Sequence, residues 1–230
     1  MTYQPHDFWQ SFLPPDTHDI APAHGHTGFY PAQMPDGRQL ALPIRVLPGD
    51  GHRAVASLIV NQASFAVEDG LASALAELLA PYAPEIIVGV PTLGLPLAAN
   101  VARRLGHARM VPLGTSRKFW YSDTLSVPLK SITTPGGGKN LYLDPRMLPL
   151  LEGRRIAVID DVISSGQSMV ATLDLLKRAG IAPIAIGAAM LQGKAWMEPL
   201  VGHLPIIVAP LRTPLLQSSA GGWHDPEVIA

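Results

Sequence analysis

The sequence contains no cysteine, so it has neither a disulfide framework nor a thiolate nucleophile. It also lacks an excess of one charge, with 17 Lys and Arg against 18 Asp and Glu, and the overall field therefore favours neither nucleic acid nor an anionic membrane as partner. No apolar run approaches the roughly 18 residues that a membrane span needs, and Met1 to Gln10 has no basic-then-apolar signal pattern. We expect a cytoplasmic protein that binds any anionic ligand through a local group of residues.

What is present is enough for one substantial core, since 47% of the 230 residues are hydrophobic. Residues 1–28 are rich in Pro and His and show no sustained period, which predicts an N-terminal arm or irregular cover. His18, His24 and His26 lack an acidic or Cys partner pattern, so we interpret them as surface residues rather than metal ligands. Residues 29–230 are expected to form a single domain.

Strand-like and helix-like segments alternate along this domain. Asp36-Gly37 separates two extended runs within Phe29 to Val46, which predicts a hairpin, and residues 54–60 favour a third strand. Further strands and helices are predicted, in chain order, at 67–79 (helix), 86–90 (strand), 95–105 (helix), 108–113 (strand), 156–159 (strand), from Met169 to before Gly180 (helix), 184–189 (strand) and 206–208 (strand). The alternation predicts an α/β fold with a mostly parallel central sheet flanked by helices.

One connection is unusually long. About forty residues between Leu113 and Gly153 have only scattered apolar positions and include Gly136-Gly137-Gly138, whereas most connections have about four to six residues. Such a segment is typical of a lid, an arm or a disordered loop.

The segment from Val158 to Ser168 carries the most chemical information. Apolar residues lead to the adjacent carboxylates Asp160 and Asp161, and a small-residue loop follows before a helix. In an open parallel sheet the acid pair is expected at the carboxyl end of a strand, where ligands bind. The loop can direct N–H groups at a phosphate, and the carboxylates can accept from sugar hydroxyls directly or reach them through hydrated Mg²⁺. The pattern therefore predicts a sugar-phosphate site.

Other phosphate-binding patterns do not fit. A Walker loop needs Gly-Lys followed by Ser or Thr, but Gly138-Lys139 precedes Asn140 and Gly193-Lys194 precedes Ala195. The turn from Gly89 to Gly94 lacks the glycine spacing of a dinucleotide site. The residues thus exclude these NTPase and dehydrogenase motifs.

The string from Val158 to Ser168 closely resembles the phosphoribosyl-pyrophosphate signature of type I phosphoribosyltransferases, and the resemblance extends over about Glu85 to Gln192. It implies a Rossmann-like type I fold with a small variable hood, a core over about 63–195, and a hood from about 29–62 and 196–230. It also implies a flexible lid over about 117–142, within which Lys130, Lys139 and Tyr142 are candidate contacts.

The resemblance further implies an enzyme that transfers ribose 5-phosphate from phosphoribosyl pyrophosphate to a nucleobase, a purine and adenine-like, releasing pyrophosphate. Mg²⁺ is the implied cofactor, held by Asp160 and Asp161 directly or through water, and a homodimer is the implied assembly. Arg117 and Lys118, together with the acid pair, are the implied catalytic residues, since Arg117-Lys118 resembles the Arg-Lys pair of adenine phosphoribosyltransferases. The implied phosphoribosyl-pyrophosphate contacts are Thr92, Leu93, Gly94, Asp160, Asp161, Ser164, Ser165, Gly166, Gln167 and Ser168.

The sequence departs from the family pattern at three positions. Ser164 stands where hypoxanthine-guanine enzymes have an Asp, which argues against those bases without selecting adenine. Gln167 replaces a second loop glycine, and Thr92-Leu93-Gly94 lacks the arginine typical of adenine enzymes. The base therefore stays open.

Base recognition in the family lies in the hood, where four aromatic residues are candidates to stack on a base, although packing roles are favoured for Phe29, Tyr30, Trp196 and Trp223. The alternative function is a non-catalytic regulatory protein that binds phosphoribosyl pyrophosphate. Against it, the sequence has no basic recognition helix and no separate helix-turn-helix pattern.

Overall fold

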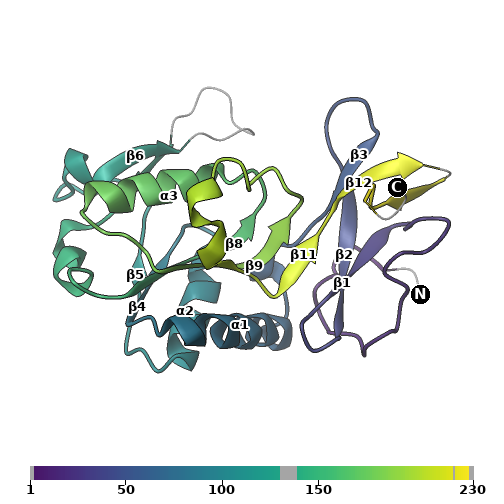
Figure 1. The fold of residues 1–230 in the computed structure, drawn as a ribbon, viewed down its shortest axis with the longest axis horizontal. Coiled ribbons are helices and arrows are strands. Elements are labelled where there is room, and N and C mark those ends of the chain that lie inside the picture. The colour runs from purple at the N-terminus through teal and green to yellow at the C-terminus, as the bar shows by residue number, and fades with distance from the viewer. Residues whose placement is uncertain (1–2, 130–138, 220, 228–230) are drawn as a thin grey trace.

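A computed structural model describes residues 3–129, 139–219 and 221–227 and contains two main sheets (Figure 1). The helices are α1 (Phe65–Leu79), α2 (Gly94–Arg104) and α3 (Gln167–Arg178). The strands are β1 (Phe29–Gln33), β2 (Gln39–Val46), β3 (Arg53–Ala56), β4 (Ile86–Gly89), β5 (Val111–Pro112), β6 (Ser126–Leu129), β7 (Lys139–Tyr142), β8 (Ile156–Ile163), β9 (Ala185–Gln192), β10 (Ile207–Val208), β11 (Leu211–Thr213), β12 (Leu215–Ser219) and β13 (Gly222–His224). No helix in the described part of the chain is long and apolar enough to cross a membrane.

The central sheet is parallel and has the strand order β10-β9-β8-β4-β5, with β11 pairing further along β9. Helices α1 and α2 cover one face and α3 covers the other (Figure 1). Because both faces are covered, β4 and the first part of β8 are continuous apolar runs rather than alternating ones. The predicted α/β fold with a mostly parallel central sheet is confirmed.

The helices lie close to their predicted bounds. Helix α1 starts two residues earlier than expected because Ser64 caps it, with its hydroxyl accepting from the N–H of Val67. One face of α1 is buried, and the buried leucines include Leu71, Leu75 and Leu79. Helices α2 and α3 present basic residues in their last turns, which suits the negative end of the helix dipole. Local periodicity therefore determined these elements.

The second sheet is antiparallel and has the order β1-β2-β3-β12-β13. The predicted β1–β2 hairpin is confirmed, and Gly37 takes a positive φ of 86° in its turn. Strand β3 is shorter than the predicted 54–60 because Val60 already begins a 3₁₀ turn. Strands β12 and β13 were not predicted. The sheet joins segments from 29–62 and 196–230, the two parts assigned to a hood, whose role stays a prediction.

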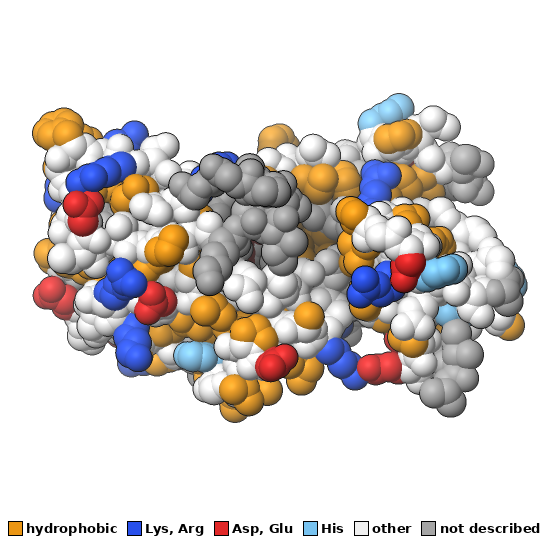
Figure 2. All heavy atoms as spheres, turned by 90° about the horizontal axis from the view of Figure 1, so that it is seen from above, with side chains coloured by type: hydrophobic (Ala, Val, Ile, Leu, Met, Phe, Trp, Pro, Cys, Tyr) orange, Lys and Arg blue, Asp and Glu red, His pale blue; other side chains and the backbone are white. Residues whose placement is uncertain are grey.

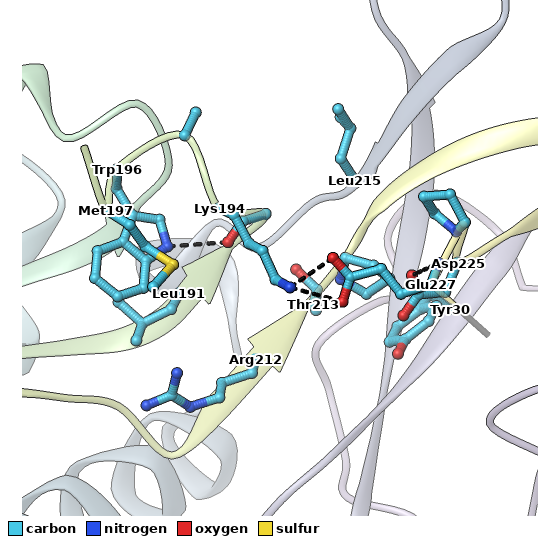
Figure 3. Close-up of a pocket in the computed structure, with 14 residues that line it drawn as sticks. Tyr30, Leu191, Lys194, Trp196, Met197, Arg212, Thr213, Leu215, Asp225 and Glu227 are labelled. Atoms are coloured by element: carbon cyan, nitrogen blue, oxygen red, sulfur yellow. Dashed lines mark hydrogen bonds and ion pairs between the residues drawn. The ribbon is translucent and has the colours of Figure 1, made fainter. Parts of the chain in front are cut away.

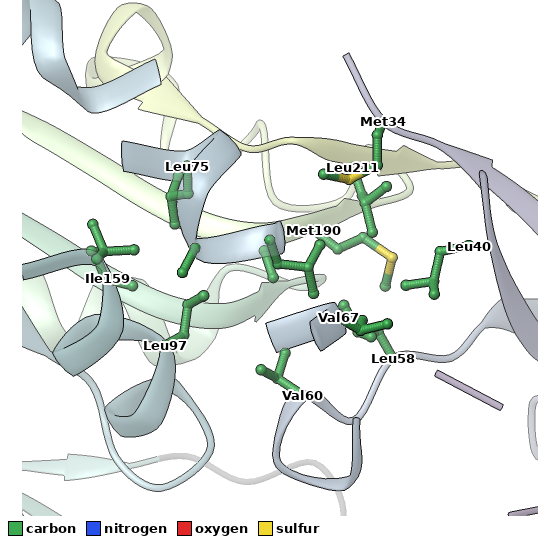
Figure 4. Packing of buried hydrophobic residues seen from close by; sticks show 14 of the residues in the cluster. Met34, Leu40, Leu58, Val60, Val67, Leu75, Leu97, Ile159, Met190 and Leu211 are labelled. Atoms are coloured by element: carbon green, nitrogen blue, oxygen red, sulfur yellow. The ribbon is translucent and has the colours of Figure 1, made fainter. Parts of the chain in front are cut away.

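The two sheets share one hydrophobic cluster (Figure 4). Met34 and Leu40 enter it from the antiparallel sheet, Met190 and Leu211 from the central sheet, and Leu75 from α1. All five side chains are nearly or fully buried. Close packing of this kind fixes the antiparallel sheet on the end of the central one.

The N-terminal segment covers the antiparallel sheet. Trp9 is buried and donates from its indole N–H to the carbonyl of Ser57 at 3.0 Å, and Leu13 pairs with Gln39. The surface assignment is wrong for His26, which is only 7% exposed and places Nε2 3.1 Å from the carbonyl oxygen of Ile20. The chain folds His26 between Tyr30 and the C-terminal hairpin, a long-range contact that local sequence does not reveal.

The long segment between Leu113 and Gly153 contains regular structure that the sequence analysis missed. Strands β6 and β7 pair antiparallel, and a 3₁₀ turn follows at Pro145–Leu150. Tyr142 is 9% exposed and packs near Tyr121, so its ring serves packing here. Lys130 lies outside the described residues, and the assignment of 117–142 as a flexible lid stays a prediction.

Candidate functional site

The acid pair lies within β8 rather than after its last residue, which corrects the expected strand end. Strand β8 continues to Ile163 because β9 pairs with it as far as Leu191. On the other side, pairing with β4 stops at Ile159. Asp160 and Asp161 therefore lie beyond the carboxyl end of β4, at an edge of the sheet where parallel strands leave room for ligands.

Burial shapes the chemistry of these carboxyl groups. Asp160 is 6% exposed, and its Oδ1 accepts from the N–H of Asp161 at 2.9 Å. Burial raises the pKa of Asp160 well above its ordinary value, and the adjacent Asp161 charge raises it further. Burial also raises the pKa of Asp161. Two close acids in a poorly hydrated place favour a cation or hydroxyl donors beside them.

This unfavourable burial predicts a stability effect for Asp160→Asn. Because the folded-state pKa is raised, the folded chain loses stability as pH rises from about 4, the ordinary carboxyl value, through the raised pKa. Asparagine carries no charge and keeps an acceptor for the N–H of Asp161. We expect Asp160→Asn to have a higher free energy of unfolding than the wild type at pH 7, and an equal one at pH 3.5. Urea unfolding at both pH values measures this, and equal stability at pH 7 would contradict it.

The loop after β8 bends sharply into α3. Gly166 precedes the helix with a φ of 78°, and a Cβ there would lie 3.2 Å from Pro199 Cγ and 3.3 Å from Trp196 Cα. Glycine therefore suits both the positive φ and the small space at this position. A hollow of about 130 Å³ is lined by Asp160, by Val162 and Ile163, and by residues 164–169. The predicted phosphate loop and the buried carboxylate thus share one small concavity at a helix N-terminus.

The turn before α2 reaches the same place. The peptide bond between Pro91 and Thr92 is cis, and Gly94 opens the helix. A Cβ on Gly94 would lie 2.9 Å from Asp160 Cα and 3.0 Å from Asp160 Oδ1. The absence of a side chain at Gly94 lets the turn approach the acid pair.

Arg117 and Lys118 lie at the surface of this structure and, within its described residues, do not contact the acid pair. Both are exposed on the segment after β5, and the guanidinium of Arg117 pairs with Asp123 at 2.9 Å. No hydrogen bond or ion pair among the described residues joins either cation to the acid pair. The structure therefore brings together the predicted residues of the β4–α2 turn and the β8–α3 loop, but not the Arg-Lys pair.

A larger hollow of about 540 Å³ opens between the two sheets (Figure 3). Its core side is formed by the end of β9 and the segment after it, including Leu191, Lys194 and Trp196. Its other side comes from Tyr30 and from the chain after β13. The remaining lining includes Met197, Arg212, Thr213, Leu215, Asp225 and Glu227.

Charge and packing within the larger hollow are specific. Lys194 binds Glu227, with its Nζ 2.7 Å from Oε2, so this pair ties the end of the chain to the core (Figure 3). Burial, with a smaller effect of the Asp225 charge, raises the pKa of Tyr30 to about 12, which keeps its phenol protonated and able to donate. Trp196 is 5% exposed and donates to the Gly193 carbonyl at 2.9 Å, so packing fixes its ring.

Sequence reasoning missed most of this hollow. Gly193-Lys194 entered only as a failed Walker pattern, and Arg212, Asp225 and Glu227 carry no local signal. They meet because β11 pairs with β9 and the chain then crosses to the antiparallel sheet. In the structure, Arg212 is exposed between buried Leu211 and Thr213 in β11.

The small and large hollows adjoin. Ile163, which lines the small one, pairs with Leu191, which lines the large one. Gly166 of the small hollow packs against Trp196 of the large one. On the face seen from above, positive and negative side chains are interspersed without a broad patch of one sign (Figure 2). The site thus combines a place for a small anion with a larger, mostly apolar chamber.

The chain is similar to known phosphoribosyltransferases. A family model described as a phosphoribosyl transferase domain matches residues 56–214. The adenine phosphoribosyltransferase of Streptomyces avermitilis is 29% identical over 163 residues, which cover 69% of this chain and 84% of that protein. The xanthine phosphoribosyltransferase of Chloroflexus aurantiacus is 31% identical over 130 residues, covering 54% of this chain and 56% of that protein.

Among solved structures, adenine phosphoribosyltransferase from Giardia lamblia complexed with 9-deazaadenine has a TM-score of 0.54 at 20% identity, over 75% of this chain and 91% of that one. The adenine phosphoribosyltransferase from Thermoanaerobacter pseudethanolicus has a TM-score of 0.50 at 21% identity, over 66% and 87%. These likenesses agree in fold with the match to residues 56–214. The chain belongs to the phosphoribosyltransferase family and has its type I fold.

Proposed function

We propose that this phosphoribosyltransferase transfers ribose 5-phosphate from phosphoribosyl pyrophosphate to a purine base, with adenine as the favoured acceptor. The observation that carries the proposal is the contact between the two hollows, through Ile163 beside Leu191 and Gly166 against Trp196. A sugar phosphate in the small hollow would present its anomeric carbon toward the large one. Adenine is favoured because the match to two adenine phosphoribosyltransferases extends over most of the length of those proteins.

The small hollow would hold the phosphoribosyl group. Backbone N–H groups and hydroxyls from residues 164–168 would bind the 5-phosphate at the start of α3, where the helix dipole favours an anion. Asp160 and Asp161 would accept hydrogen bonds from the ribose hydroxyls. The turn at Thr92, Leu93 and Gly94 would approach the pyrophosphate, since Gly94 already contacts Asp160.

The donor set at the acid pair fits Mg²⁺. This ion prefers oxygen ligands and commonly combines one or two carboxylates with substrate phosphates and water. Within the described residues, no group of three or more His, Cys, Asp or Glu residues could hold a metal, so Asp160 and Asp161 would share the ion with substrate. When bound, Mg²⁺ supplies positive charge to the pyrophosphate.

The large hollow would hold the acceptor base. Its apolar walls suit a flat ring, and the protonated phenol of Tyr30 would offer a donor. A base nitrogen would form the new bond to the anomeric carbon as the bond to the pyrophosphate oxygen breaks, and the proton of that nitrogen would pass to the released pyrophosphate. Arg117 and Lys118 would stabilise the departing negative charge once the segment that carries them approaches the site. Exclusion of water would prevent hydrolysis of the sugar.

A base screen tests the function. Purified protein with phosphoribosyl pyrophosphate and Mg²⁺ is expected to release pyrophosphate with adenine faster than with hypoxanthine, guanine, xanthine or a pyrimidine base. Release of pyrophosphate and formation of the nucleotide are measured together, so that hydrolysis is recognised. Faster turnover with another base would correct the acceptor alone.

Tight binding of phosphoribosyl pyrophosphate without turnover on any base would instead support the regulatory alternative, and a salt-dependent shift of duplex DNA would favour a transcriptional regulator. The homodimer and the cytoplasmic location stay predictions, which sedimentation and fractionation of cells measure directly.

A further inference from the structure

The segment that carries Arg117 and Lys118 is attached to the body of the protein at Trp120. The indole N–H of Trp120 donates to Asp144 Oδ2 at 3.4 Å. The guanidinium carbon of Arg146 lies 4.5 Å from the centre of the Trp120 ring, within the range of a cation–π interaction. One aromatic ring therefore contacts both members of an Asp-Arg pair.

That Asp-Arg pair is itself held in place. Arg146 donates to both carboxylate oxygens of Asp144, with Nε 3.0 Å from Oδ1 and Nη2 2.6 Å from Oδ2. The same carboxylate accepts from the backbone N–H of Arg146 and caps the 3₁₀ turn at Pro145–Leu150. The Asp144 side chain is only 12% exposed, and hydrogen bonds from Arg146 hold its pKa at about 2. A bidentate pair of this kind has a fixed geometry.

The loop is also tied at its beginning. Gly114 and Tyr142 exchange two backbone hydrogen bonds, of 3.0 and 2.8 Å. Around Trp120 the backbone makes a turn in which the N–H of Tyr121 donates to the carbonyl of Lys118 at 3.0 Å. Arg117 and Lys118 thus lie between two points at which the segment is attached to the body of the protein. These are Gly114 and Trp120, and Trp120 is only two residues after Lys118.

We propose that Trp120, Asp144 and Arg146 form a positioning unit, here called the indole clamp, that anchors the segment next to Lys118, so that Arg117 and Lys118 reach the pyrophosphate end of the substrate when the segment approaches the site. The inference rests on the proposed function, because the cations need a polyanionic substrate for their position to matter. The clamp residues act through the loop and need not touch the substrate. Misplacing a charged group by about 1 Å can cost up to about 100-fold in rate, so loss of the clamp should have a measurable effect.

The neighbouring aromatic residue provides a matched control. Phe119 is 96% exposed, against 40% for Trp120, and its recorded aromatic contact is edge-on to Trp120 at 4.7 Å. It lies one residue nearer to the cations in sequence than Trp120 does, but it touches neither Asp144 nor Arg146 among the described contacts. Replacing either residue by Leu removes one surface aromatic ring, yet only Trp120→Leu removes the clamp.

The experiment compares KM values in the base-dependent release of pyrophosphate. For Trp120→Leu we expect the KM for phosphoribosyl pyrophosphate and the inhibition constant of added pyrophosphate to rise between about 10- and 100-fold. The KM for the base and the melting temperature should change little. Phe119→Leu should match the wild type, and Trp120→Phe, which keeps a ring face for Arg146, should lie between. Equal effects of Trp120→Leu and Phe119→Leu, or a matching rise in the base KM, would overturn the proposal.

A combination of variants separates the clamp from the cations. In a chain that already carries Arg117→Gln and Lys118→Gln, Trp120→Leu should add no further rise in the KM for phosphoribosyl pyrophosphate, since residues that act as a unit are not additive. An additive effect would contradict the clamp. If the Arg117→Gln, Lys118→Gln chain keeps wild-type kinetics, the assigned role of those cations fails and the clamp with it, whereas the phosphoribosyl site at Asp160 is unaffected. Arg146→Gln is the second clamp variant should Trp120→Leu fold poorly.

Discussion

Replacement of both Asp160 and Asp161 by Asn is expected to lower the rate of pyrophosphate release by at least about 100-fold while the chain stays folded. The substitution removes both charges that would orient the ribose and hold Mg²⁺, but it keeps side-chain volume at two buried or half-buried positions. Asparagine at 160 also keeps an oxygen that can accept from the N–H of residue 161. In the wild type, Asp160 Oδ1 accepts this hydrogen bond at 2.9 Å. Steady-state kinetics at saturating substrates and urea unfolding measure the two parts separately.

Asp174→Asn is the matched control for this double variant. Asp174 lies on α3, exposed, and pairs with Arg178 at 3.2 Å one helical turn away. Exposed pairs of this type contribute at most about 1 kcal/mol, so both activity and stability should stay close to wild type. Full activity in the double variant would exclude the acid pair from the reaction, while unfolding of that variant would leave the single Asp161→Asn chain to measure the charge effect.

Gly94→Ala is expected to have the second-largest effect, because its added methyl group would lie 2.9 Å from the Asp160 backbone. Backbone cannot swing away as a flexible side chain can, so α2 or β8 must shift. We expect about 1–3 kcal/mol lower stability and a fall in activity of about 10- to 100-fold. Circular dichroism melts and pyrophosphate release check both values.

Gly202→Ala controls for the loss of glycine itself. A Cβ at Gly202 meets nothing within 4 Å, and the residue is in a 3₁₀ turn without a positive φ. This variant should match the wild type in both measurements. If Gly94→Ala had the stability and activity of the wild type, neither property would depend on the close approach between the turn and the acid pair.

Local sequence was sufficient where one element contains its own signal. The spacing of four residues between Leu71, Leu75 and Leu79 places them on one helix face and specified α1, and the apolar run from Ile156 to Ile159 specified the start of β8. Asp36-Gly37 specified the first hairpin because a tight turn needs glycine at a positive φ. The string from Val158 to Ser168 indicated the family, since its acids and its loop are contiguous, and its role as the phosphoribosyl site stays a prediction.

Local sequence was insufficient where a feature depends on a distant partner. The acid pair was expected after the strand, but pairing with β9 extends β8 to Ile163. Strands β6 and β7 pair although residues 130–138 separate them in the sequence, and they contain too few apolar positions to be predicted as strands. His26 is buried because the C-terminal hairpin covers it through Trp223, some two hundred residues later in the chain.

The sequence alone therefore determined the family, the α/β fold and the proposed phosphoribosyl end of the site, because each depends on contiguous residues or on a local period. The tertiary structure decided the larger hollow, proposed for the acceptor base, where Tyr30, Lys194 and Glu227 meet from three distant segments. It also decided the indole clamp, in which Trp120 reaches across to Asp144 and Arg146. Such contacts arise from packing between distant segments, and patterns within short stretches of one sequence do not predict them.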